Sequence, residues 1–150
     1  AAMARNALNR TPPLGFFRTF VMEQDGKHNN SINLKRRGTA PMVDLVRIHA
    51  LACGSKAQNS FQRLNDIGNT QLLATGMSEK LSYAFEFLCM SRLRHQMIDL
   101  QEDRLPDNNI EPENVEDSER HTLKDAFQVL SNAQKFLKFR YPMPAQRQGR

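Results

Sequence analysis

The sequence predicts a mainly α-helical bundle preceded by a short β-hairpin. Apolar residues recur at helical spacing in the segments 41–53, 79–103 and 118–141. In the segment 16–38, aromatic and alternating apolar residues flank a run of turn formers, a pattern typical of two short strands joined by a loop. At 150 residues, the chain is long enough for one domain with a buried core.

The two ends of the chain differ from its middle. Residues 1–10, AAMARNALNR, favour a helix that the following TPPLG stops. We therefore expect the tail of an upstream helix or a linker there, in a chain that is part of a longer protein. The helical domain is expected to span 11–141, and residues 142–150 form a polar C-terminal tail.

The hairpin is predicted from residue types that favour extended backbone. Phe16, Phe17 and Phe20 favour the first strand, and INLK alternates apolar and polar residues as a second strand would. Asp25-Gly26 is a common turn pair, although the loop around it is long. The hairpin should end at Gly38, which places the basic residues before it at a strand end.

The helices have recognisable ends. Pro41 fits the first turn of the first long helix, where a missing amide costs little. A short amphipathic helix should close at Gly68, and Ser78 and Ser118 are suitable caps for the two longest helices. The acidic link LPDNNIEPENVED separates these two. In the last helix one apolar stripe faces a polar side, as in an ordinary bundle helix: Leu123, Ala126, Leu130, Ala133 and Leu137.

The helix 79–103 is unusual because its apolar stripe becomes polar halfway along. The stripe begins with Leu81, Ala84, Phe85 and Leu88 and continues into Arg92, His95, Gln96 and Asp99. Buried charges need partners or a wet cavity, because an unpaired one costs several kcal/mol. Two interpretations stay open: Arg92 and Asp99 satisfy each other and the neighbouring helices, or the bundle opens here and the polar groups meet a ligand.

Charge is unevenly distributed. Residues 1–60 hold nine lysines and arginines against three acidic residues, whereas the rest of the chain holds twelve against thirteen. A basic front of this kind suits a phosphate-bearing partner, but a solvated surface explains it as well. Aromatic residues do not alternate with the basic ones as stacking platforms would require, which disfavours a nucleic-acid-binding module.

Catalytic and metal-binding patterns are weak. Gly54-Ser55 followed by Asp66 imitates part of a nucleotidyltransferase motif, but those enzymes need two carboxylates one residue apart, and position 68 is glycine. The four histidines are scattered, and Cys53 and Cys89 have the apolar surroundings of buried thiols. We therefore predict no catalytic residue, no metal site and no cofactor in this chain.

A resemblance to a known family adds to these observations. The motifs PPLGFF, LKRRG-x-x-P-x-VDL-x-R and RLRHQ resemble the family named "putative nucleotidyltransferase substrate-binding domain", over about residues 11–141. Such domains are helical bundles at the C-terminus of bacterial signal-transduction proteins, after CBS or cyclic-nucleotide-binding modules and a nucleotidyltransferase similar to uridylyltransferases. The resemblance implies substrate-binding positions at Lys35, Asp44, Arg47, Arg63, Arg92, His95 and Gln96.

The resemblance also implies partners. An upstream nucleotidyltransferase domain would supply Mg²⁺ and a nucleoside triphosphate, and this domain would present a phosphate- or carboxylate-bearing substrate or an acceptor protein. Lys35 would approach a phosphate, Arg92 would bind it bidentately, and His95 and Gln96 would orient the ligand. Asp44 and Arg47 could equally form a local pair.

Location and assembly follow from weaker signals. No apolar run approaches the roughly 20 residues of a membrane-spanning helix, and residues 1–10 lack the apolar core of a secretory signal, so we expect a cytoplasmic protein without a membrane segment. A homodimer is compatible with the sequence. The main alternative to substrate binding is a regulatory or dimerisation bundle.

Overall fold

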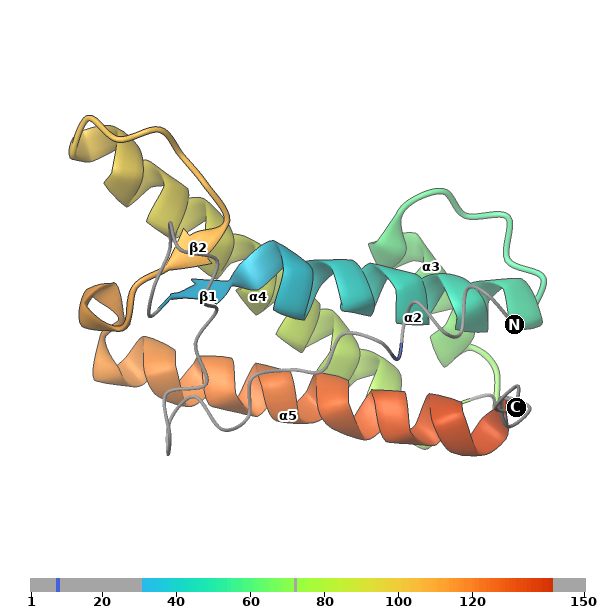
Figure 1. Cartoon of the computed structure of the whole chain (residues 1–150). Coiled ribbons are helices and arrows are strands. Elements are labelled where there is room, and N and C mark those ends of the chain that lie inside the picture. The colour runs from blue at the N-terminus through green and yellow to red at the C-terminus, as the bar shows by residue number, and fades with distance from the viewer. Residues whose placement is uncertain (1–7, 9–30, 72, 142–150) are drawn as a thin grey trace, which may run out of the picture.

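The computed structural model describes residues 8, 31–71 and 73–141. Its helices and strands confirm a mainly α-helical fold with a small antiparallel sheet (Figure 1). The α-helices of the described part are α2 Ala40–Ala52, α3 Ser60–Gly68, α4 Met77–Gln101 and α5 Asp117–Arg140. None of them is long and apolar enough to cross a bilayer.

A small antiparallel sheet is present, as predicted, but the strand that pairs with β1 (Ile32–Asn33) was not predicted. Strand β1 pairs antiparallel with β2 (Asn109–Ile110), which lies in the acidic link between α4 and α5. The link also contains a single 3₁₀ turn, Pro112–Asn114. The strand expected at 16–21 lies outside the described residues. The link is therefore attached to the start of the bundle, and the amide of Leu34 extends this attachment by donating to the carbonyl of Asn108 at 2.8 Å.

The basic segment after β1 is helical, and its expected position at a strand end is wrong. Residues Lys35–Thr39 form a π-helix, η2, that runs directly into α2, and the amide of Ala40 donates to the carbonyl of Lys35. Gly38 is buried here, and a Cβ atom on it would lie 3.4 Å from the side chains of Leu88 and Phe127, an ordinary van der Waals distance. The segment η2 therefore packs directly against α4 and α5.

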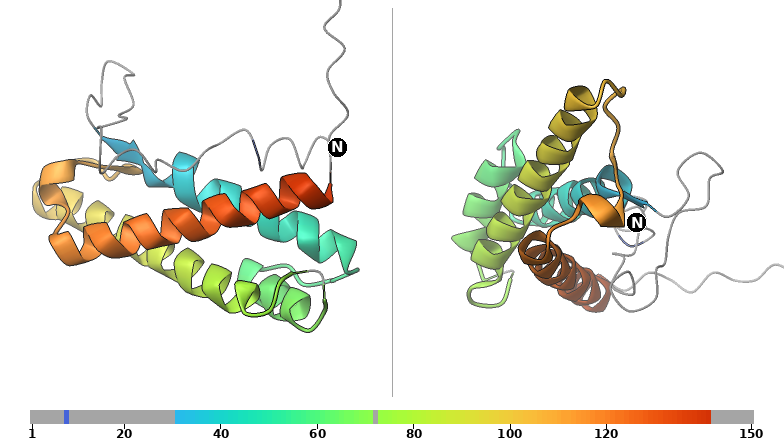
Figure 2. Two further views of the ribbon diagram at one scale, coloured as in Figure 1. Left: turned by 90° about the horizontal axis from the view of Figure 1, so that it is seen from below. Right: turned by 90° about the vertical axis from the view of Figure 1, so that its left-hand side faces the viewer.

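The core lies between α2, α4 and α5, with α3 packed against α2 and α4 (Figures 1 and 2). The apolar stripe predicted for the last helix is buried, as are the first apolar residues of α4. Removing such side chains from water is the main stabilising contribution to a fold of this size. The largest fully buried side chains include Met42, Leu45, Leu64, Leu81, Leu88, Phe127 and Leu130.

The two longest helices begin slightly before the predicted caps. Gly76, with a φ of 79°, precedes α4, and Glu116 precedes α5. Ser78 and Ser118 therefore lie inside the first turns and do not cap the helices. A left-handed backbone at Gly76 suits glycine because it has no Cβ atom to clash.

Candidate functional site

The polar residues in the second half of α4 point toward three different neighbours. Ser91, Arg94 and His95 contact the first turn of α5. Arg92 contacts η2. Gln96 contacts the link before β2. The polar residues of α4 therefore do not face one common space along the helix. They make three separate contacts, which fix the rotation of α4 about its own axis.

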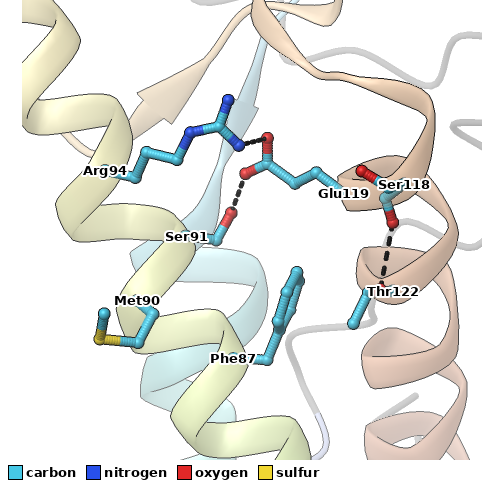
Figure 3. A pocket seen from close by; sticks show the side chains of 7 residues that line it. All are labelled: Phe87, Met90, Ser91, Arg94, Ser118, Glu119 and Thr122. Atoms are coloured by element: carbon cyan, nitrogen blue, oxygen red, sulfur yellow. Dashed lines mark hydrogen bonds and ion pairs between the residues drawn. The ribbon is translucent and has the colours of Figure 1, made fainter.

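Glu119 is the centre of the contact with α5. Its Oε1 atom accepts a hydrogen bond from Ser91 Oγ at 2.5 Å and lies 3.0 Å from His95 Nε2, and its Oε2 atom accepts one from Arg94 at 2.7 Å (Figure 3 shows Ser91, Arg94 and Glu119). Ser91, His95 and Glu119 are all buried. Because a carboxylate only accepts, Nε2 of His95 carries the proton in this contact.

The environment of Glu119 keeps its carboxylate ionised. Burial alone would raise the pKa of Glu119, but hydrogen bonds from His95 and Ser91, and the charges of His95 and Arg94, outweigh burial and hold the pKa below its ordinary value. Glu119 also lies in the first turn of α5, where the helix dipole favours a negative charge. The Glu119 cluster (Ser91, Arg94, His95 and Glu119) is thus a satisfied ionic contact between two helices.

A cavity of about 320 Å³ opens beside this cluster. Figure 3 shows Phe87 between α4 and α5 and Met90 on the outer side of α4. The volume lies at the lower end of the range for small-molecule pockets. Its lining combines an apolar part with the exposed side of the Glu119 cluster: Phe87, Met90, Ser91, Arg94, Ser118, Glu119 and Thr122.

Arg92 has a weaker partner than the other arginines of α4 and the link. It donates a 3.4 Å hydrogen bond to the hydroxyl of Thr39, at the end of η2. Within the described ranges neither Arg92 nor the exposed Lys35 pairs with a carboxylate. Burial raises the pKa of the Cys89 thiol, and the nearby positive charge of Arg92 only partly opposes this rise. Among the residues that the structure describes, Arg92 is thus a half-buried cation bound to a neutral group.

Of the two interpretations left open by the sequence, the one that pairs Arg92 with Asp99 does not match the contacts of Asp99. Asp99 instead accepts hydrogen bonds from Arg104 at 2.8 and 3.2 Å, next to the end of α4. Gln96 donates to the carbonyl of Asp107 at 3.0 Å. These contacts hold the link against α4 and leave Arg92 oriented toward η2.

The remaining predicted site residues lie on α2 and α3. Asp44 and Arg47 form the local pair that their spacing allows, at 3.5 Å. The Nε atom of Arg63 donates to the carbonyl of Ala57 at 2.9 Å and so fixes the connection before α3. The structure therefore brings two of the predicted motifs together, LKRRG and RLRHQ, through Thr39 and Arg92. The contacts of Asp44, Arg47 and Arg63 described above lie within α2 and at the start of α3.

Two further groups were missed by the sequence argument. Glu119 falls in the same helical stripe as Leu123 and Leu130, so it interrupts an apolar face just as Arg92 and His95 do. The same reasoning applied to the last helix would have identified it. His49 on α2 is fully buried, with its ring near Phe136 and Tyr141.

Comparison with known families gives one match. The sequence profile of the family described as "Putative nucleotidyltransferase substrate binding domain" matches residues 1–141. The chain belongs to this family. It is therefore a nucleotidyltransferase substrate-binding domain by family, and the resemblance of its motifs is confirmed. Comparisons with curated proteins and with solved structures gave no match.

Proposed function

We propose that this substrate-binding domain holds an anionic group, a phosphate or a carboxylate, with Arg92 and Lys35. The observation that carries the proposal is the contact of Arg92, a half-buried guanidinium whose partner within residues 31–71 and 73–141 is a neutral hydroxyl at 3.4 Å. Arg47, Arg94 and Arg104 each have a carboxylate partner instead. A guanidinium carries five N–H donors, so most of those on Arg92 remain for a ligand.

The surrounding structure favours a phosphate or carboxylate over a neutral ligand. Lys35 comes from the π-helix η2, whose last residue contacts Arg92. Short π-helical segments are often found at functional sites. A planar guanidinium binds such oxyanions bidentately, and an ammonium adds a mobile point charge. Gln96 supplies an amide on the same helix.

The Glu119 cluster has a supporting role in this proposal. It fixes α4 to α5 through three hydrogen bonds and so sets the direction in which Arg92 leaves the helix. His95 is then a positioning residue, because its ring is buried against Glu119. Asp44, Arg47 and Arg63 remain predicted substrate-binding positions that extend the site over α2 and α3.

The proposal includes a division of labour with a neighbouring domain. An upstream nucleotidyltransferase domain, similar to uridylyltransferases, would supply Mg²⁺, the nucleoside triphosphate and the catalytic carboxylates. This chain would present the substrate or acceptor protein without catalysing transfer. A bacterial, cytoplasmic signal-transduction protein with CBS or cyclic-nucleotide-binding modules is the setting that we propose.

The test is an NMR titration of the chain with inorganic phosphate, acetate and uridine monophosphate. We expect at least one of these anions to shift the backbone amide signals of η2 and of α4 around Arg92. Arg92→Gln should weaken binding by about tenfold to a hundredfold, because a hydrogen bond to a charged group contributes about 1.5–3 kcal/mol. Arg104→Gln is the matched control, since that arginine is held by Asp99 and Glu102. Equal binding by both variants would refute the proposed site.

A further inference from the structure

The outer face of α4 carries an apolar stripe that the bundle does not cover. Its five apolar members each expose more than half of their surface: Tyr83, Met90, Leu93, Met97 and Leu100. Together with Glu86 they are spaced alternately by three and four residues along the helix. This spacing is the heptad pattern by which one α-helix packs against another.

The stripe lies opposite the core-facing side of the same helix. At about 100° per residue, Met90 and Leu93 lie on the far side of α4 from Leu88 and His95, which are buried. From Tyr83 to Leu100 the stripe extends about 26 Å, at 1.5 Å per residue. A long, narrow seam of this shape fits a partner helix better than a broad protein surface.

The size of the stripe is sufficient for an interface. Burying a whole Leu or Met side chain removes roughly 100 Å² from water, so five that are about half exposed leave roughly 300 Å² of apolar surface. Apolar patches of this area on a monomer are often functional. With flanking residues such as Phe87 and Gln96, the contact would reach about 600 Å² per copy, near the lower limit for a specific dimer.

We propose that this stripe pairs with the same stripe on a second copy of the chain, with the two α4 helices antiparallel. Among the helices of the described ranges, α4 is the one that presents this seam, so a second α4 is the complementary surface. Parallel pairing would place Glu86 against its own copy, whereas antiparallel pairing centred between Ser91 and Arg92 places Glu86 opposite Met97 of the second copy. Parallel pairing would therefore bring two like charges together, which favours the antiparallel orientation.

The neighbouring cavity accommodates this pairing. Phe87 and Met90, which flank and form the seam, also line the 320 Å³ cavity between α4 and α5 (Figure 3). A side chain of the second helix can enter this hollow as a knob enters a hole. The last turns of α4 extend away from α2 and α5 in Figure 1 and in the right-hand view of Figure 2, which leaves the end of the seam accessible.

The first test is the mass of the chain in solution by sedimentation equilibrium at micromolar concentrations. We expect a dimer, and we expect the double substitution Met90→Glu with Leu93→Glu to weaken dimerisation at least a hundredfold. The side chains of both residues are exposed, so the circular dichroism spectrum should not change. Phe139→Glu is the control, because Phe139 is exposed on α5 outside the stripe, and this variant should remain dimeric. Met97→Glu provides a second, single-site disruption of the seam, because the new carboxylate would face Glu86 of the second copy.

The second test determines the orientation by cross-linking. In a background with Cys53→Ser and Cys89→Ser, Met90→Cys and Leu93→Cys variants are oxidised separately and as a mixture. Antiparallel pairing predicts that the mixture forms disulfide-linked dimers far more efficiently than either variant alone. Efficient self-linking of Met90→Cys would overturn the antiparallel orientation. A monomeric chain, or a dimer that resists both Met90→Glu with Leu93→Glu and Met97→Glu, would overturn the interface and leave the stripe to a different protein or domain.

Discussion

Replacing the buried Glu119 with alanine should destabilise the domain more than replacing any of the exposed or half-buried charged residues described above. The change removes the shared acceptor of Ser91, Arg94 and His95, and two of these donors are themselves buried. Stranding one side of a buried ionic contact typically costs about 3–5 kcal/mol. For a domain of 150 residues this corresponds to a fall in melting temperature of about 10 °C.

The assay is urea unfolding of the wild type and the variant, followed by circular dichroism. Glu116→Ala is the matched control, because Glu116 is three residues away, exposed, and only 3.5 Å from the same Arg94. An exposed pair of this kind contributes at most about 1 kcal/mol. The reasoning fails if Glu119→Ala and Glu116→Ala lower the free energy of unfolding equally.

The pH dependence of the same difference is a second check on Glu119. The pKa of its carboxyl group is lowered on folding from its ordinary 4.5, so the folded state favours the ionised form. The stability that this group contributes is therefore fully present above pH 4.5 and is lost as the pH falls through the lower, folded pKa. The difference in the free energy of unfolding between the wild type and the Glu119→Ala variant should therefore become smaller at acidic pH.

Three further outcomes are expected. Burial, and then the charge of Arg140, lower the pKa of His49 from 6.5 to about 4. As the pH falls, the unfolded chain therefore binds a proton at this residue before the folded chain does, and the free energy of unfolding should fall by about 2 kcal/mol between pH 6.5 and about pH 5. Urea unfolding of the His49→Phe variant should not show this fall. Arg92→Ala should change the melting temperature by only about 2 °C, because its bond to Thr39 is long and to a neutral group, and a large drop in a thermal scan would contradict the ligand site. The purified chain with Mg²⁺ and labelled nucleoside triphosphates should label no acceptor, since Gly68 stands where the second carboxylate of the Gly54-Ser55 and Asp66 pattern would be needed. Time-dependent labelling would reveal an overlooked centre.

The fold could be predicted from sequence where local periodicity determines structure. The stripe of Leu123, Leu130 and Leu137 is sufficient to predict both the last helix and its buried face. The pairing of β1 with β2 could not be predicted, because two residues per strand carry almost no pattern and their partners are distant in sequence. The π-helix at Lys35 was missed because its alternating neighbours imitate a strand.

The site could be predicted in part for the same reason. Arg92 and His95 were identifiable because they interrupt an apolar stripe on their own helix. Their partners, Thr39 and Glu119, lie 53 and 24 residues away in sequence, so the pairing depends on how helices pack. The exposure of the outer seam of α4 could not be predicted, because the sequence of a helix that is apolar on two faces does not reveal which of them the bundle covers.

The small sheet has a consequence for the order of folding. Its paired residues are roughly 75 positions apart, and the entropy cost of closing a loop rises with its length. The helical pair α4 and α5 brings together residues much closer in sequence, so it should form earlier than the β1–β2 pairing. Disrupting this pairing should then accelerate unfolding while hardly changing the rate of folding. The few hydrogen bonds that attach the acidic link to β1 and Leu34 would thus control how long the native domain survives, and contribute little to how quickly it forms.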